Sequence, residues 1–304
     1  MPKQTKPSWI RRKVTRNATS DEVGNVLRLL KLNSVCEHAA CPNISECWGN
    51  KDVTFMILGD ICTRGCKFCN IDSDNVLPAM PDSDEPRRIA EAVKKLGMRY
   101  VVVTSVTRDD LEDKGAEHFL NTAREIKHAA PEARVELLIP DFGGDRELLE
   151  KIAFSGADVI GHNIETPRIV YPAVRPRSDY DVSLKTLSIL SSMKKTGADI
   201  LVKSSMILGL GEEEEDITRT LKDLKNAGVD ILYLGQYLAP SRKHWPVKRY
   251  YRPEEFTSFE KEARAIGFTA VLASPFVRSS YHAAETLRGH AIWGHPSRTK
   301  ITRF

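Results

Sequence analysis

Residues 53–69 read VTFMILGDICTRGCKFC, and this stretch determines both the fold class and the type of site that we expect. Its first seven residues, 53–59, form an apolar run with the length of a buried strand. Three cysteines follow at C-x3-C-x2-C spacing, so the expected strand leads directly into a loop that carries three thiols. Gly65, inside that loop, can adopt the positive φ that a tight turn requires.

The six cysteines of the 304-residue chain all lie between positions 36 and 69. They form two triplets: Cys36, Cys41 and Cys47 (C-x4-C-x5-C), then Cys62, Cys66 and Cys69 (C-x3-C-x2-C). Neither triplet has a fourth cysteine nearby, whereas a closed structural site normally has four protein ligands. The pattern therefore indicates two metal centres, each one thiolate short.

Three kinds of cysteine site compete. Disulfide frameworks are typical of small secreted chains, whereas this chain has 41% hydrophobic residues and begins without an apolar signal segment. Structural zinc is the stronger alternative, but it usually requires a fourth ligand, and His38 is awkwardly spaced between Cys36 and Cys41. Iron–sulfur ligation fits best, because three thiolates can hold three irons of a [4Fe–4S] cube and leave the fourth iron open.

The composition is that of an ordinary globular chain. The net charge is +4, 28% of the residues are charged, and no apolar run approaches the ~20 residues of a membrane span. The basic residues lack interleaved aromatics, which argues against nucleic-acid binding. We expect no membrane partner, and the absence of a leader segment favours a cytoplasmic location.

A weak repeat indicates how the chain is organised. Four times a helical segment ends at a glycine and a β-branched run begins two residues later, at Gly97, Gly156, Gly197 and Gly228. The strands expected from such runs are 53–59, 100–104, 134–139, 158–162, 200–206 and 231–236. The helices expected between and after them are 85–96, 116–129, 145–155, 181–195, 214–227 and 253–266.

Six strand–helix units predict an α/β fold, a partial (β/α)6 TIM-type barrel with right-handed crossovers. A doubly wound sheet is the alternative, but no G-x-G-x-x-G follows the first strand. We expect a cysteine-bearing N-terminal extension at 1–51, the barrel at 52–270 and a C-terminal extension at 271–304. Active sites of such barrels lie at the carboxyl ends of the strands, where the second cysteine triplet would lie.

The C-x3-C-x2-C spacing, with Phe68 before the last cysteine, resembles the motif that defines the radical S-adenosylmethionine (SAM) superfamily. The resemblance implies that Cys62, Cys66 and Cys69 hold a [4Fe–4S] cluster whose open iron binds SAM. An electron then cleaves SAM to methionine and a 5′-deoxyadenosyl radical. Polar residues and glycines at other strand ends would contact SAM, namely Thr104, Asn163, Glu165, Lys203, Gly209 and Gly211.

The ordered pair of triplets resembles the lipoyl synthase family within that superfamily. Further matches span about residues 20–285: VTSVTRDDL at 103–111, IPDF at 139–142, GHNIET at 161–166, VRP at 174–176, GLGE at 209–212, GQYL at 235–238 and RSSY at 278–281. The family's pattern has a Ser-Gly pair where Ser204-Ser205 stands and commonly a leucine at Trp245. Neither departure removes a ligand.

The resemblance implies that Cys36, Cys41 and Cys47 hold an auxiliary [4Fe–4S] cluster with a serine of the RSSY segment as fourth ligand. We favour Ser280 over Ser279. An oxygen ligand is unusual for a cluster that prefers thiolates, which suggests that the serine-bound iron is the labile corner. The implied reaction uses two SAM molecules and inserts sulfur from the auxiliary cluster at carbons 6 and 8 of a protein-bound octanoyl chain.

The implied partners are an octanoylated carrier (glycine cleavage H protein or a 2-oxoacid dehydrogenase E2 domain), an electron donor such as flavodoxin or ferredoxin, and an iron–sulfur carrier that rebuilds the cluster. Basic residues near both ends are either solvated tails or steer acidic carriers: Lys3, Lys6, Arg11, Arg12, Lys13 and Arg16, then Arg288, Arg298, Lys300 and Arg303. The alternatives are another two-cluster radical SAM enzyme, such as a methylthiotransferase or a biotin-synthase-like protein, and a zinc-stabilised binding module without catalysis.

Overall fold

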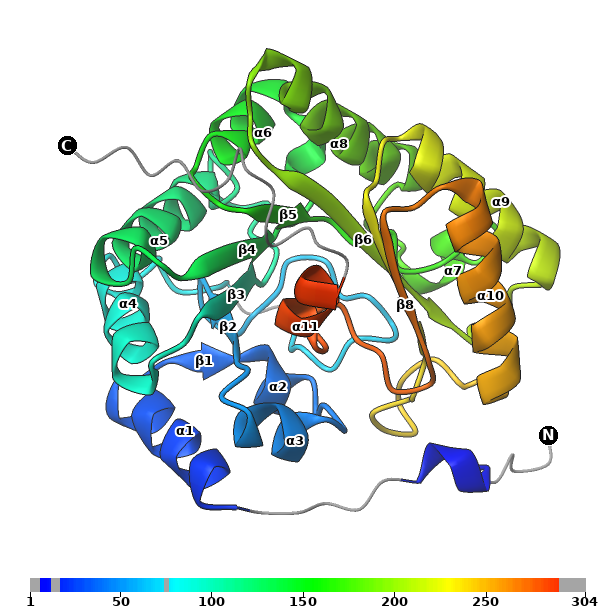
Figure 1. The fold of residues 1–304 in the computed structure, drawn as a ribbon, viewed down its shortest axis with the longest axis horizontal. Coiled ribbons are helices and arrows are strands. Elements are labelled where there is room, and N and C mark those ends of the chain that lie inside the picture. Colours follow the sequence, from blue (N-terminus) through cyan, green and yellow to red (C-terminus); the bar gives the residue numbers. More distant parts are fainter. Residues whose placement is uncertain (1–5, 12–16, 74–76, 290–304) are drawn as a thin grey trace.

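The computed structural model describes residues 6–11, 17–73 and 77–289. In this part of the chain a curved sheet has the strand order β1 to β8, and Figure 1 shows the helices packed around its outside. The parallel strands are β2 (Thr54–Ile57), β3 (Tyr100–Ser105), β4 (Arg134–Leu138), β5 (Val159–Gly161), β6 (Leu201–Leu208), β7 (Ile231–Gln236) and β8 (Ala270–Ala273). β1 (Asn33–Ser34) pairs antiparallel with β2.

The predicted fold class is confirmed. Strand order follows chain order without a reversal, which is the order of a barrel and excludes a doubly wound sheet. β1 and β8 do not pair in the described residues, so the barrel is partial. The six expected helices are present as α4 (Glu85–Leu96), α5 (Ala116–Ala129), α6 (Arg146–Ala153), α8 (Tyr180–Met193), α9 (Glu214–Asn226) and α10 (Pro253–Ile266).

β8 is an additional parallel strand that the sequence analysis did not predict, and it spans the predicted domain boundary after residue 270. The glycine repeat contains a fifth copy that indicates it. α10 ends at Gly267, whose φ of +106° is the left-handed conformation that glycine adopts at low cost. Phe268-Thr-Ala-Val-Leu follows, with Ala270 where the other copies have a tyrosine, a valine or an isoleucine.

The two extensions pack against the barrel and against each other. The amino-terminal part supplies η1 (Ser8–Ile10), α1 (Ala18–Leu29), α2 (Val35–His38) and α3 (Ile44–Gly49), and the carboxyl-terminal part supplies α11 (Ala283–Gly289). The Asn43 side chain donates a hydrogen bond of 2.7 Å to the Phe276 carbonyl, 233 residues away. Figure 1 shows α11 in the middle of the view, over the barrel interior.

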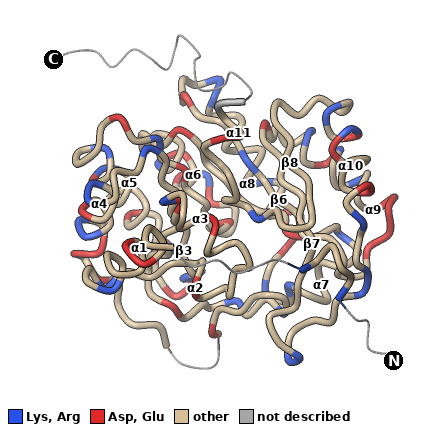
Figure 2. The backbone as a smooth tube through the Cα atoms, turned by 60° about the horizontal axis from the view of Figure 1, so that its bottom comes forward, with Lys and Arg blue, Asp and Glu red and all other residues tan. Residues whose placement is uncertain are grey.

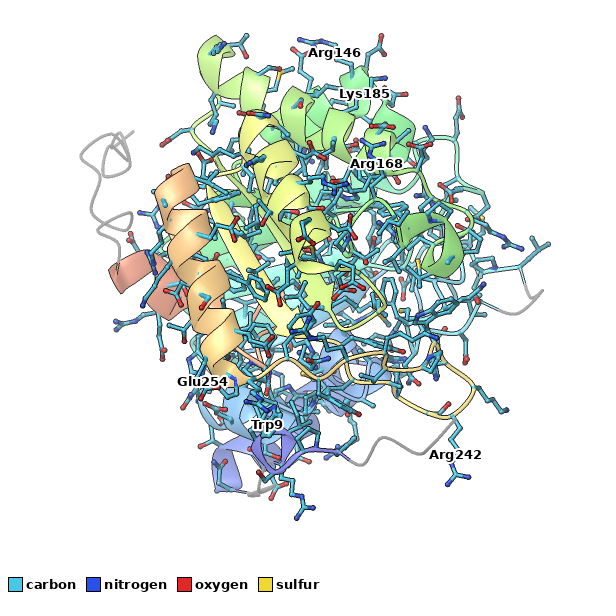
Figure 3. The ribbon with its side chains drawn as sticks, turned by 90° about the vertical axis from the view of Figure 1, so that its right-hand side faces the viewer. Trp9, Arg146, Arg168, Lys185, Arg242 and Glu254 are labelled. Carbon is cyan, nitrogen blue, oxygen red and sulfur yellow. The ribbon has the colours of Figure 1, made fainter. Side chains whose placement is uncertain are left out.

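The short helix η1 is held beside the start of α10. The Trp9 indole donates to the Tyr251 carbonyl at 3.2 Å, and Figure 3 shows Trp9 near Glu254. Ile10 of η1 is buried as well. No helix within residues 6–11, 17–73 and 77–289 is long and apolar enough to cross a membrane.

Candidate active site

A cavity of about 460 Å³ lies where the carboxyl ends of the strands meet the two cysteine motifs. Cys36 and Cys41 of the first motif and Cys69 of the second line this one cavity, although the two motifs are separate in the sequence. Thr104, Asn163, Glu165 and both serines of the RSSY segment also line it. Its volume is typical of small-molecule sites.

The loop with the second triplet is fixed by one buried arginine. Arg64 is 8% exposed, and its guanidinium contacts Asp109, in the loop after β3, at 2.8 Å. It also contacts Asp141, in the loop after β4, at 2.7 Å. Although burial opposes it, the hydrogen bond from Arg64 holds the pKa of Asp141 well below its usual range. Arg64 therefore ties the cysteine loop to two neighbouring strand ends.

Backbone hydrogen bonds complete this loop. The Cys62 N–H donates to the Asp72 carbonyl at 2.8 Å, and the Cys69 N–H donates to the Cys66 carbonyl at 3.0 Å. Gly65 has a φ of +62°, as the turn requires. In the first triplet, Cys36 lies on α2 and Cys47 on α3.

All six cysteines are free thiols, so the disulfide alternative is wrong. Burial raises the pKa of Cys36 to about 11 and that of Cys69 to about 12, and it raises the pKa values of Cys47 and Cys66 as well. Such thiols are protonated at neutral pH, and cations that bind them displace the protons. In the described residues, no three His, Cys, Asp or Glu side chains are grouped to hold a single metal ion.

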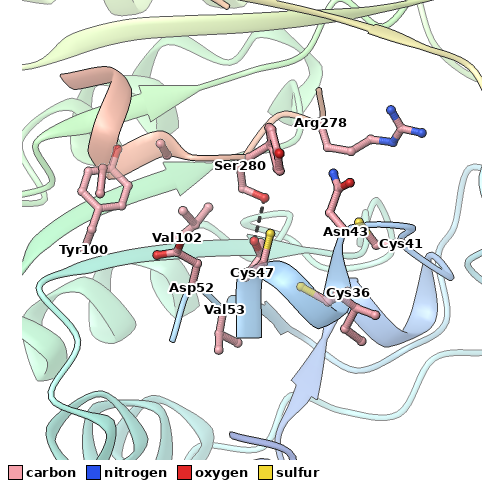
Figure 4. A pocket seen from close by; sticks show the side chains of 15 residues that line it. Cys36, Cys41, Asn43, Cys47, Asp52, Val53, Tyr100, Val102, Arg278 and Ser280 are labelled. Atoms are coloured by element: carbon pink, nitrogen blue, oxygen red, sulfur yellow. Dashed lines mark hydrogen bonds between the residues drawn. The ribbon is translucent and has the colours of Figure 1, made fainter. Parts of the chain in front are cut away.

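A second, smaller cavity of about 30 Å³ gathers the first triplet with residues of the C-terminal segment. Figure 4 shows Cys36, Cys41 and Cys47 on one side and Ser280 and Arg278 on the other. The Thr54 hydroxyl donates to Ser280 Oγ at 2.7 Å. Ser279 does not line this cavity, although it lines the larger one.

Three residues predicted to contact SAM line the larger cavity. The Thr104 hydroxyl donates to the Leu138 carbonyl at 2.9 Å, and the Asn163 amide donates to Glu165 at 3.1 Å. Burial raises the pKa of Glu165, and its φ is +68°, in the left-handed region that a non-glycine residue rarely adopts. Such strain is concentrated at functional sites.

Lys203, Gly209 and Gly211 are not among the residues that line either cavity. The Lys203 ammonium contacts both carboxylate oxygens of Glu136, at 2.8 and 3.0 Å, inside the barrel. The backbone N–H groups of both glycines donate to the Glu212 carboxylate, at 2.5 and 3.0 Å. The SAM contacts predicted for these three residues stay predictions.

Three further strand-end residues belong to the site, although the SAM contacts predicted from the sequence do not include them. Ser105, Gln236 and Tyr237 line the large cavity, and the buried Ser105 hydroxyl makes no hydrogen bond in the described residues. Their signal was position, because all three lie at or just after the end of a strand. An unpartnered hydroxyl and cysteines of both motifs in the wall of one cavity fit sulfur-ligated metal together with a polar small molecule.

Comparison with known proteins identifies the superfamily to which the chain belongs. The family model described as the radical SAM superfamily matches residues 56–224, so the chain belongs to that superfamily. The solved FeFe-hydrogenase maturase HydG from Carboxydothermus hydrogenoformans has a similar fold, with a TM-score of 0.56 and 16% identity over 88% of this chain and 68% of that chain.

Closer relatives narrow the assignment. A lipoyl synthase of Caldicellulosiruptor saccharolyticus is 46% identical over 95% of this chain and 99% of its own length. A lipoyl synthase of Thermus thermophilus is 48% identical over 92% of this chain and 86% of its own length. Within the superfamily, the chain belongs to the lipoyl synthase family.

Proposed function

We propose that the protein acts as a lipoyl synthase, inserting two sulfur atoms at carbons 6 and 8 of an octanoyl chain on a lysine of a carrier domain. The observation that carries this proposal, beyond family membership, is one cavity with thiols of both triplets in its wall. The C–H bonds of a saturated acyl chain have no acidic proton, so side chains acting as acids and bases cannot break them. A cofactor must supply that chemistry.

Cys62, Cys66 and Cys69 would hold a SAM-binding [4Fe–4S] cluster. Cys36, Cys41, Cys47 and Ser280 would hold a second [4Fe–4S] cluster. When bound, the first cluster and SAM supply a hydrogen-abstracting radical and the second cluster supplies sulfide. The choice of Ser280 over Ser279 is supported by the small cavity, which Ser280 shares with all three thiols of the first triplet.

The chain's own residues would then position and shield the reactants. Arg64 fixes the cysteine loop through its two carboxylate partners. Asn163 and Glu165 offer an amide and a carboxylate to the ammonium and hydroxyl groups of SAM. The apolar wall would hold the acyl chain and exclude water; it includes Met56, Phe68, Leu138, Met206, Ile207 and Leu238.

The substrate would be an octanoylated glycine cleavage H protein or 2-oxoacid dehydrogenase E2 domain in the cytoplasm, with an iron–sulfur carrier to rebuild the spent cluster. Lys6 lines the large cavity, which supports a role for the basic N-terminal arm in attracting acidic carriers. Lys3, Arg12, Lys13, Arg16, Arg298, Lys300 and Arg303 lie outside the described residues. Arg11 is exposed.

The test is anaerobic incubation of the iron-reconstituted protein with an octanoyl-lysine peptide, SAM and dithionite. We expect the peptide to gain two sulfur atoms by mass spectrometry. Cys66→Ala should abolish both 5′-deoxyadenosine formation and sulfur gain, whereas Cys47→Ala should abolish sulfur gain and still form 5′-deoxyadenosine. A methylated or singly thiolated product, or zinc in place of iron and sulfide, would refute the proposal.

A further inference from the structure

We propose a docking surface for an acidic one-electron donor protein. It is the outer face of the cysteine loop together with residues 237–252, the loop after β7, which we call the crossing loop. The surface consists of Lys67, Arg177, Arg242, Lys243 and Lys248, which we name the basic patch. This inference rests on the proposed function, because a SAM-cleaving cluster must receive each electron from outside the chain.

The crossing loop is bound directly to the backbone of the cysteine loop. The Trp245 N–H donates to the Lys67 carbonyl at 2.9 Å, and the Lys67 N–H donates to the Val174 carbonyl at 2.8 Å. The ammonium groups of Lys67 and Lys248 lie 5.4 and 5.6 Å from the centre of the Trp245 ring. Both cations therefore lie against the ring of one tryptophan. One of them, Lys67, directly follows Cys66 in the chain.

The other members of the basic patch either donate to the cysteine loop or precede Trp245 in its own loop. Arg177 is exposed and donates to the Thr63 carbonyl, in the same cysteine loop, at 2.9 Å. Arg242 and Lys243 are exposed and lie two or three residues before Trp245. Figure 3 shows Arg242 extending into solvent, and Figure 2 shows lysines and arginines near α7 (Tyr171–Val174), which precedes Arg177.

The charge of the basic patch is not neutralised locally. None of its five members forms an ion pair within the described residues, whereas neighbouring Arg64 and Arg249 each have two carboxylate partners. Uncompensated, exposed charges of one sign attract an oppositely charged partner and raise its association rate. The occupant that fits is therefore an acidic protein.

Packed side chains connect the basic patch to the cysteines. Phe68, Tyr237, Trp245 and Val247 belong to one apolar cluster, and the Tyr237 hydroxyl donates to the Trp245 carbonyl at 2.7 Å. Tyr237 and Cys69 in turn line the same large cavity. Electron tunnelling is faster through packed matter than across a gap, so these packed side chains give a continuous route from Trp245 to the cavity that Cys69 lines.

The position of the basic patch favours an electron donor over the acyl carrier. None of its five residues lines the large cavity, so a partner docked there need not insert a group into it. Electron-transfer complexes have small, weak, charge-guided interfaces, which a patch of this kind can provide. In the transfer, one electron passes from the donor protein to the metal site that the cysteine loop would hold. The donor is oxidised by one electron, the metal site is reduced by one electron, and no bond or proton moves.

The test compares Arg242→Glu/Lys243→Glu with the control Lys195→Glu/Lys222→Glu, which reverses two exposed lysines outside the basic patch. One readout is the Kd of oxidised flavodoxin for the reconstituted protein at low and high salt. We expect the patch variant to bind about tenfold more weakly at low salt, the difference shrinking at high salt, and the control to match the parent.

The second readout is 5′-deoxyadenosine formation with reduced flavodoxin or with dithionite. The patch variant should be slowed about tenfold with flavodoxin and unchanged with dithionite, because a small reductant needs no docking surface. Equal effects of the two variants would overturn the proposal, as would loss of octanoyl-carrier binding with flavodoxin binding retained. Sulfur gain on the peptide with dithionite tests the proposed function separately.

Discussion

Replacing Lys203 by methionine should destabilise the protein strongly, and SAM binding to the folded form then tests the predicted cofactor contact separately. Lys203 and Glu136 face each other inside the barrel with side chains 4% and 1% exposed. The Tyr100 hydroxyl donates to the same carboxylate at 2.6 Å, and the Lys203 ammonium lies 4.1 Å from the centre of the Tyr233 ring. The ammonium therefore has a full set of protein partners.

The magnitude follows from what the substitution leaves behind. Lys203→Met leaves the Glu136 carboxylate buried with only the tyrosine hydroxyl as a donor, and breaking a buried ion pair in this way costs about 3–5 kcal/mol. Lys203→Met/Glu136→Gln removes both charges and keeps an acceptor for Tyr100. It should therefore recover to within about 1–2 kcal/mol of the parent.

The assay is urea unfolding of the reconstituted protein followed by circular dichroism, with SAM binding measured by equilibrium dialysis at low urea. Lys195→Met, which removes an exposed ammonium, is the matched control and should leave the unfolding midpoint unchanged. The reasoning fails if Lys203→Met unfolds at the parent's midpoint but no longer binds SAM. Lys203 would then be a cofactor contact and not part of the barrel's internal ion pair.

The remaining predictions concern three residues. Burial lowers the pKa of His162 to about 4, so its contribution to stability is present above about pH 6.5 and is lost as the pH falls towards 4. Between pH 7 and pH 4.5, the free energy of unfolding should therefore fall by about 2–3 kcal/mol less in His162→Asn than in the parent. Urea unfolding at the two pH values measures this, and an unchanged pH dependence would contradict it. Ser280→Cys should still assemble iron and sulfide but impair sulfur gain on the peptide; full activity would refute the labile-corner hypothesis. Gly209→Ala should cost about 2 kcal/mol or more, because its new Cβ would lie 2.3 Å from the Gln236 amide nitrogen at a φ of +102°. Gly97→Ala, at a φ of +64° with nothing within 4 Å, is the control and should cost only about 1 kcal/mol in the same unfolding assay.

The partial barrel could be predicted because its signals are local. A glycine such as Gly97 ends a helix by its own backbone freedom, and the apolar run after it forms a buried strand wherever the rest of the chain lies. β8 was missed because its run is rich in small residues, so its pairing with β7 supplies what its composition does not. β1 has only two residues, which is too short for any periodic pattern.

The candidate site likewise has one part with a local sequence signal and one part without. Spacing alone separated the two cysteine triplets, because ligands on one loop are placed by the local chain. Ser280 is different, since its hydroxyl meets Thr54 across 226 residues of sequence. Without family resemblance, no local pattern could have paired these two positions.

The sequence by itself therefore determined the strand–helix repeat and the thiol-bearing loop after the first barrel strand. Only the tertiary structure decided that Ser280 faces the first triplet, that Arg64 fixes the second, and that Lys203 is paired with Glu136 inside the barrel. The physical reason is that backbone conformation depends mainly on near neighbours in the chain. Buried charges and metal ligands instead need partners brought together by folding, and those partners come from distant strands.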